Sequence, residues 1–90
     1  MTELMSASSV EEDIRQVLGE VARLRIPAES LTAQDDLYAA GLSSLATVDV
    51  MLAIEDRFEI EFTSEWLNRR TFASISALGA AVAALREDAP

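Results

Sequence analysis

A chain of 90 residues is long enough for one small domain and too short for two, and its low aromatic content of 6% favours a helical bundle over a β-sandwich. The absence of cysteine excludes disulfides, a thiolate nucleophile and cysteine-ligated metals. Its 16 acidic residues against 7 arginines give a net charge of −9, which disfavours nucleic acids and anionic lipids and attracts basic protein surfaces.

The N-terminal residues 1–8 are predicted to form a flexible tail. They contain an acid at Glu3, no basic segment and no long apolar run, so they do not resemble a secretory signal. No apolar run in the chain approaches the roughly 20 residues that span a membrane. We expect residues 9–88 to form a single domain in a soluble, cytoplasmic monomer.

The first predicted helix begins with a capping box, in which Ser9 is followed three residues later by Glu12. We expect it to end near Arg25, because Pro27 pushes Ile26 out of the helical region. Its apolar residues recur at helical spacing and define one buried stripe of Val10, Ile14, Val17, Leu18, Val21 and Leu24.

A long ordered loop is predicted to follow, closed by Gly41. Its apolar anchors are Ile26, Leu31, Leu37 and Tyr38. From Ser44 to Glu59 the sequence has neither glycine nor proline, which predicts a second helix of about four turns.

The second helix is predicted to carry apolar residues on two faces. At ~100° per residue, one stripe points toward the core and contains Thr47, Val50, Met51, Ile54 and Phe58. The second group, Leu45, Val48 and Leu52, lies about 100–160° away, among and beside the acids Asp49, Glu55, Asp56 and Glu59. An apolar patch framed by acids predicts a docking surface for a protein with an apolar pocket and surrounding arginines. Alternatively, the loop of residues 26–40 folds back and covers the three apolar residues.

Two further elements complete an all-α fold. Thr63 or Ser64 is predicted to cap a short helix of one or two turns, and we expect its residues Trp66 and Leu67 to close the core. The last helix is predicted over residues 74–86, with an apolar stripe of Ile75, Leu78, Val82 and Leu85. The expected architecture is a four-helix bundle with three longer helices, one short helix and a long loop between the first two helices.

Catalysis by this chain alone is not expected. A nucleophilic serine needs a neighbouring base, usually histidine and sometimes lysine, and the sequence contains neither. The acid pairs Asp35–Asp36 and Glu55–Asp56 are adjacent in sequence and do not share a helical face, so we expect no metal site. If Ser43 or Ser44 reacts, another protein must supply the chemistry.

The segment "DDLYAAGLSSLATVDVMLAIEDRFEIEF" resembles the acyl carrier and peptidyl carrier proteins. Their hallmark is a Gly-x-Asp-Ser-Leu turn that leads into an acidic second helix, and the resemblance extends over nearly the whole chain. Counterparts of the family pattern are the Asp-Asp-Leu sequence, Gly41, the Ser44–Leu45 pair, the Glu55–Asp56 pair, Phe58 and the "IEF" that follows.

The resemblance implies that a phosphopantetheinyl transferase, with its magnesium ion, moves 4′-phosphopantetheine from coenzyme A onto Ser44. The terminal thiol of this arm would carry an acyl or aminoacyl group as a thioester. Other implied partners are an acyl- or amino-acid-activating ligase and a downstream acyltransferase or synthase. The implied partner-binding residues are Leu45, Val48, Asp49, Leu52, Glu55 and Asp56, the set that the helical winding also selects. The resemblance also offers a place on the cargo side for Trp66 and Leu67, as the alternative to the core closure that we prefer.

One position departs from the family pattern, because Ser43 stands where the family usually has aspartate. Serine caps a helix about as well as aspartate, so we expect Ser43 to be the N-cap. Ser44 would then occupy the first helical position, near unpaired backbone N–H groups and the positive end of the helix dipole.

Two functions from different classes compete. The first is a freestanding carrier protein, with aminoacyl cargo favoured over a fatty or polyketide acyl chain. The second is an unmodified acidic adaptor whose second helix docks on a basic protein. The carrier hypothesis predicts that Ser44→Ala abolishes function and leaves the fold intact, whereas the adaptor hypothesis predicts that function survives.

Overall fold

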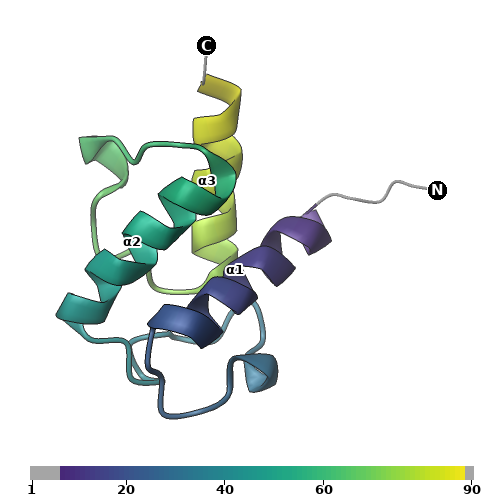
Figure 1. Ribbon diagram of the computed structural model, residues 1–90, viewed down its shortest axis with the longest axis vertical. Coiled ribbons are helices and arrows are strands. Elements are labelled where there is room, and N and C mark those ends of the chain that lie inside the picture. The colour runs from purple at the N-terminus through teal and green to yellow at the C-terminus, as the bar shows by residue number, and fades with distance from the viewer. Residues whose placement is uncertain (1–6, 89–90) are drawn as a thin grey trace.

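Within residues 7–88, three α-helices enclose a shared core, as the ribbon in Figure 1 shows: α1 (Ala7–Val21), α2 (Ser44–Phe58) and α3 (Ile75–Asp88). Two short 3₁₀ turns, η1 (Ala28–Ser30) and η2 (Ser64–Trp66), lie in the connections. The computed structural model describes residues 7–88, which contain no β-strand. The all-α prediction is therefore confirmed, with the short predicted helix present as the 3₁₀ turn η2.

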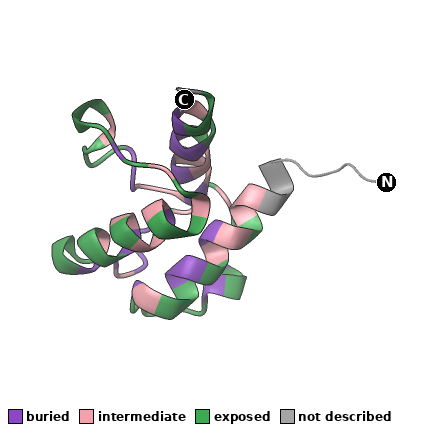
Figure 2. Ribbon diagram, turned by 45° about the horizontal axis from the view of Figure 1, so that its top comes forward, coloured by how far each residue is buried: buried purple, intermediate pink, exposed green. Residues whose placement is uncertain are grey.

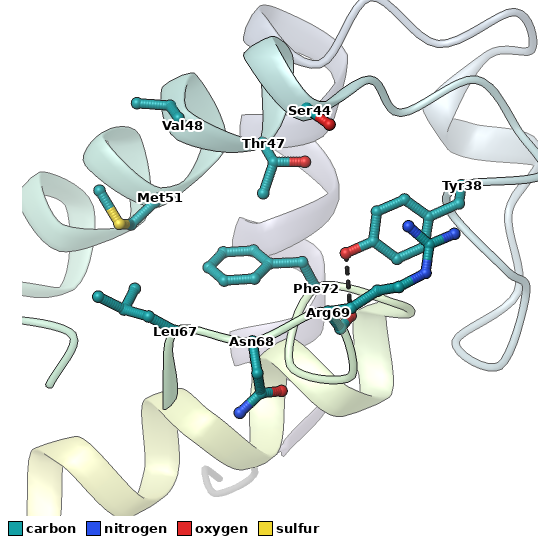
Figure 3. A pocket seen from close by; sticks show the side chains of 9 residues that line it. All are labelled: Tyr38, Ser44, Thr47, Val48, Met51, Leu67, Asn68, Arg69 and Phe72. Atoms are coloured by element: carbon teal, nitrogen blue, oxygen red, sulfur yellow. Dashed lines mark hydrogen bonds between the residues drawn. The ribbon is translucent and has the colours of Figure 1, made fainter. Parts of the chain in front are cut away.

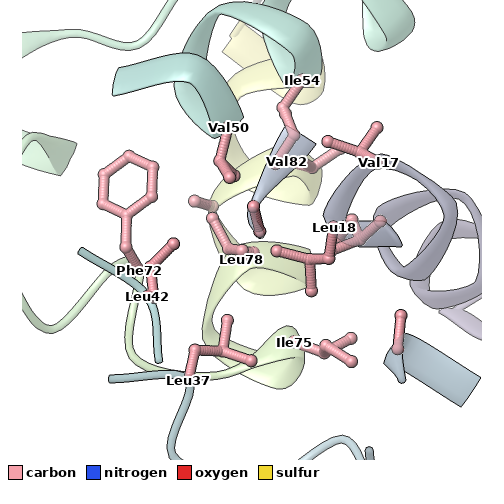
Figure 4. Close-up of a cluster of buried hydrophobic side chains, with 14 of the residues drawn as sticks. Val17, Leu18, Leu37, Leu42, Val50, Ile54, Phe72, Ile75, Leu78 and Val82 are labelled. Carbon is pink, nitrogen blue, oxygen red and sulfur yellow. The ribbon is translucent and has the colours of Figure 1, made fainter. Parts of the chain in front are cut away.

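The core forms where the inward faces of the helices meet, because α1 contacts both α2 and α3. Leu37 and Leu42 from the long loop and Phe72 from the segment before α3 fill the space between them (Figure 4). Full burial of one such side chain is worth about 1.5–3 kcal/mol. The largest helical side chains that are almost wholly buried are Ile14, Val17, Leu18, Val50, Ile54, Ile75, Leu78 and Val82.

Both predicted ends of the first helix are wrong. α1 starts at Ala7, so Ser9 lies inside the helix instead of at its cap. α1 ends at Val21, and Arg23 adopts the left-handed conformation with φ 55°, which turns the chain before Pro27 is reached. Of the predicted tail, residues 1–6 lie outside the described residues, and the remaining two are helical.

The long loop between α1 and α2 is ordered by backbone hydrogen bonds to the rest of the fold. The Leu37 N–H donates to the Ala73 carbonyl at 2.8 Å, and the Ser76 N–H donates to the Ala33 carbonyl at 2.9 Å. Leu31 and Leu37 are buried as predicted. Ile26, another predicted anchor, is 42% exposed, so that prediction is wrong.

The turn into α2 requires glycine. Gly41 has φ 114°, a conformation that residues with a side chain rarely adopt. A Cβ atom at this position would lie 3.1 Å from the backbone nitrogen of Arg25, whose N–H donates to the Ala40 carbonyl at 2.9 Å. The turn therefore brings the end of the long loop against the chain that follows α1.

The C-terminal end of α2 is held by side chains from two directions. The Arg57 guanidinium donates to Asp13, at 3.2 Å, and to Gln16, both on α1. Glu55 Oε2 accepts from the backbone N–H of Phe62 at 2.8 Å, which fixes the chain after the helix. The C-terminal end of α2 is thus tied both to α1 and to the chain that follows the helix.

The predicted core stripe of α2 is correct at its centre. Val50 and Ile54 are fully buried, but Thr47, Met51 and Phe58 are only partly buried. Ala46, which is 6% exposed, belongs to the core, so the buried stripe is rotated toward it. This rotation turns Thr47 and Met51 toward a groove beside the helix.

Candidate functional site

The two adjacent serines have different hydrogen-bond environments. Ser43 is the N-cap of α2, with extended backbone angles of φ −89° and ψ 166°. Its Oγ accepts from the Ala46 N–H at 3.0 Å, and its carbonyl accepts from the Thr47 N–H at 2.9 Å and the Thr47 hydroxyl at 2.8 Å. The Ser43 side chain is therefore committed to the start of the helix.

Ser44 is the first residue of α2 and is exposed to solvent. Its hydroxyl forms no hydrogen bond with any other described residue. The backbone N–H groups of Ser44 and Leu45 also have no hydrogen-bond acceptor within residues 7–88. Free N–H groups and the positive end of the helix dipole favour a negatively charged group at this position.

An open groove of about 340 Å³ runs from Ser44 along one side of α2. This lies at the lower end of the roughly 300–1,000 Å³ typical of small-molecule sites. In Figure 3, the α2 residues face the segment that precedes α3, with Tyr38 near Ser44. The residues that line it are Tyr38, Ser44, Thr47, Val48, Met51, Leu67, Asn68, Arg69 and Phe72. The groove therefore combines apolar walls with a few polar groups.

Tyr38 and Arg69 join the long loop to the segment before α3. The Tyr38 hydroxyl donates to the Arg69 carbonyl at 2.9 Å, and the guanidinium carbon of Arg69 lies 3.9 Å from the centre of the tyrosine ring. Partial burial raises the pKa of Tyr38 above 10.0; the positive charge of Arg69 opposes this shift, and Asp36 adds to it. The phenol is therefore neutral at physiological pH and is able to donate this hydrogen bond.

Asn68, although it lines the groove, is largely engaged in shaping its own loop. Its side-chain nitrogen donates to the Glu65 carbonyl at 3.0 Å. Its side-chain oxygen accepts from the Thr71 N–H at 3.0 Å and from the Thr71 hydroxyl at 3.2 Å. Asn68 thus holds the wall of the groove, whereas the Arg69 guanidinium, like the Ser44 hydroxyl, has donors that are free among the described residues.

The predicted docking surface of α2 is uncovered. Leu45 is 78% exposed, Val48 48% and Leu52 53%, so the long loop does not fold over them and that alternative is wrong. The exposed face of α2 is seen in green in Figure 2. Asp49 and Asp56 are exposed beside these residues, whereas the half-buried Glu55 is engaged with Phe62. Five of the six predicted residues therefore present free side chains.

Leu67 and Trp66 have separate roles. Leu67 is 48% exposed and lines the groove beside Ser44, so the prediction that it closes the core is wrong. Trp66 is partly buried and packs against the core, as we expected. No pattern in the sequence singles out Asn68, Arg69 or Phe72, whose place in the groove follows only from the tertiary fold.

Two other features are absent from the part of the chain that the structure describes. Among these residues, no three acidic, histidine or cysteine side chains come close enough together to hold a metal ion. Likewise, none of the helices within residues 7–88 has the length and apolar character needed to cross a membrane. The exposed hydroxyl, its groove and the apolar patch are thus the features that point to a function.

Comparisons with known proteins agree with these features. A family model described as "Phosphopantetheine attachment site" matches residues 12–82. The curated "Aminoacyl carrier protein" of Agrobacterium fabrum is 49% identical over 65 residues, which cover 72% of this chain and 78% of that protein.

Solved structures give the same result. One match, with a TM-score of 0.79 and 45% identity over 81% of this chain and 97% of the other, is a chain in the crystal structure of engineered Bradyrhizobium japonicum glycine:carrier protein ligase complexed with carrier protein from Agrobacterium tumefaciens and AMP. A holo acyl carrier protein from Nitrosomonas europaea matches with a TM-score of 0.73 and 27% identity, over 88% of this chain and 96% of the other.

Proposed function

Because this chain belongs to the phosphopantetheine attachment site family, we propose that Ser44 is the residue that carries its 4′-phosphopantetheine arm. The protein is a carrier and not a catalyst. When attached, the arm supplies a terminal thiol that holds an acyl or aminoacyl group as a thioester. What the chain itself contributes is a correctly placed hydroxyl, a groove beside it and a surface for the enzymes that use it.

One observation supports Ser44 over its neighbour. Both serines are exposed, but Ser43 Oγ accepts from the Ala46 N–H, whereas the Ser44 hydroxyl has no partner among the described residues and lies at the helix N-terminus, where a phosphodiester is favoured. In the attachment, a bond forms between Ser44 Oγ and the phosphorus of the phosphopantetheine, and the pyrophosphate bond of coenzyme A breaks. Adenosine 3′,5′-bisphosphate leaves, and the serine proton passes to a base of the transferase, because this chain has no histidine or lysine.

The test is intact-mass analysis after incubation with coenzyme A, magnesium and a broad-specificity phosphopantetheinyl transferase. The wild-type protein should gain the mass of one phosphopantetheine, and Ser44→Ala should gain none. The matched control is Ser43→Asp, which removes the other hydroxyl but keeps a side-chain oxygen for the helix cap, and should be modified. Modification of Ser44→Ala, or of the wild type but not of Ser43→Asp, would contradict the assignment.

The proposed cargo is an amino acid, with glycine as the first candidate. Support comes from the 49% identity to an aminoacyl carrier protein and the 45% identity to a chain from the ligase complex. The corresponding partner is a ligase that activates the amino acid with ATP and transfers it to the thiol. The modified protein should gain the mass of one aminoacyl group from such a ligase, and hydroxylamine should remove it. Loading by a fatty-acyl ligase, with no loading by amino-acid ligases, would contradict this cargo.

The proposed docking surface for this ligase is the exposed side of α2. It consists of Leu45, Val48, Asp49, Leu52, Glu55 and Asp56. The three apolar side chains are available to enter a pocket of the ligase. The acids attract basic residues around that pocket, which accelerates association and makes the association rate sensitive to salt. The adaptor hypothesis uses the same surface but has no place for the family's covalent arm, so the carrier function is favoured.

A further inference from the structure

Arg69 is distinctive among the seven arginines of this chain. It lines the groove that begins at Ser44, and its guanidinium carbon lies over the Tyr38 ring, 3.9 Å from the ring centre. The two salt bridges among the described residues involve Arg15 and Arg57, so no carboxylate lies within ion-pair distance of Arg69 there. Its guanidinium also donates no hydrogen bond to the described residues, which leaves a planar set of donors free.

Pairing with Asp36 does not explain the position of the Arg69 guanidinium. Asp36 lines a separate hollow together with Arg69, but its Oδ1 accepts from the Tyr38 N–H at 2.9 Å. A guanidinium stacked on an aromatic ring is held in place while its edge stays available. In a protein with a net charge of −9, an unpaired arginine at the groove next to the attachment serine is suited to binding an anion.

We propose that Arg69 is a positioning residue that binds the phosphodiester of the arm on Ser44. This inference rests on the proposed function, because the phosphodiester is present only when Ser44 is modified. The free N–H groups of Ser44 and Leu45 and the Arg69 guanidinium would then act on the phosphate oxygens together.

Binding of the phosphate in this way directs the end of the arm that is attached to Ser44 into the groove. The next part of the arm would run past the apolar side chains of Val48, Met51 and Leu67, which line the same groove. Dissociation of the phosphodiester from Arg69 would free the arm to move toward an enzyme. Arg69 therefore sets where the arm lies between enzymes and takes no part in the chemistry of loading.

The experiment compares apo and phosphopantetheinylated forms of three proteins: wild type, Arg69→Gln and Arg70→Gln. Arg70 is the matched control, because it is an exposed neighbouring arginine that does not line the groove beside Ser44. Modification should raise the thermal midpoint of the wild type by about 1–8 °C, the range expected for one exposed ion pair in a small domain. The increase should be smaller in Arg69→Gln, where only the helix N-terminus still acts on the phosphate, and it should persist in full in Arg70→Gln and shrink at high salt.

Two more measurements separate binding from a purely structural role. Arg69→Lys, which keeps the positive charge, should retain part of the increase. In NMR spectra of the wild type, the side-chain Nε–Hε signal of Arg69 should shift on modification, and that of Arg70 should not. The NMR measurement decides the question even if Arg69→Gln fails to fold.

The inference is overturned if modification changes neither the midpoint nor the Arg69 signal, or if Arg70→Gln has the same effect as Arg69→Gln. Mass analysis distinguishes this failure from failure of the proposed function. If no phosphopantetheine is added at Ser44, the proposed function is wrong. If it is added and Arg69 does not respond, only the inference about Arg69 is wrong.

Discussion

Replacing Glu55 by alanine is expected to destabilise the fold, although this residue lies within the proposed docking surface. Glu55 Oε2 accepts from the Phe62 N–H at 2.8 Å, and Phe62 is only 6% exposed. Leaving a buried N–H without a partner costs about 1–3 kcal/mol, and the better helix propensity of alanine offsets only a few tenths of this. For a domain of this size, each kcal/mol lowers the thermal midpoint by about 4–8 °C.

The assay is urea unfolding followed by far-ultraviolet circular dichroism, with Asp56→Ala as the matched control. Asp56 is the exposed neighbour on the same helix, and its carboxylate forms no hydrogen bond or salt bridge within the described residues, so its replacement should change the free energy of unfolding by less than about 0.5 kcal/mol. Glu55→Gln, which keeps an acceptor oxygen, should lie between the two. The reasoning is refuted if Glu55→Ala is as stable as Asp56→Ala.

Three further predictions concern α2 and the groove. Ser43→Ala removes the acceptor of the Ala46 N–H and should lower the free energy of unfolding by about 1 kcal/mol in urea titrations. Ser43→Asp should not lower it, and an equal loss of stability in both variants would contradict the role of Ser43 as the helix cap. Leu45→Ala, at a side chain that is 78% exposed, should leave stability within about 0.5 kcal/mol but raise the KM of the loading ligase about fivefold or more; an unchanged KM would exclude Leu45 from the docking surface. Because burial raises the pKa of Tyr38 above 10.0, the folded state holds the phenol proton more tightly, so this contribution to stability is complete below pH 10.0 and is lost as the pH rises through the folded pKa. Between about pH 8 and about pH 11, the thermal midpoint should fall less in Tyr38→Phe than in the wild type. An equal fall in both proteins would contradict the raised pKa of Tyr38.

The start of α2 could be predicted from the sequence because its signals are local. Gly41 marks the turn, Ser43 has a side chain that can cap, and no helix breaker follows until after the last turn. The end of α1 could not be predicted in the same way. Arg23 adopts a left-handed conformation that glycine or asparagine usually marks, and the obvious stop signal, Pro27, lies farther along the chain.

The groove beside Ser44 could be predicted only in part. Its α2 wall follows from helical periodicity, although the core stripe was expected to include Thr47 and Met51. The opposite wall comes from residues 67–72, whose position depends on the hydrogen bonds between the long loop and the chain at the start of α3. The contact between Tyr38 and Arg69 depends on this long-range packing, and no periodicity within either segment indicates it.

The anchoring of α2 at both ends has a consequence for how such proteins diversify. The contacts that hold the helix are made by Ser43 at one end and by Glu55 and Arg57 at the other, while Leu45, Val48 and Leu52 lie between them and are exposed. Substitutions at these three positions can therefore accumulate with little effect on folding. A gene duplicate could acquire a different ligase through changes on this face alone, while the scaffold and the attachment serine stay the same.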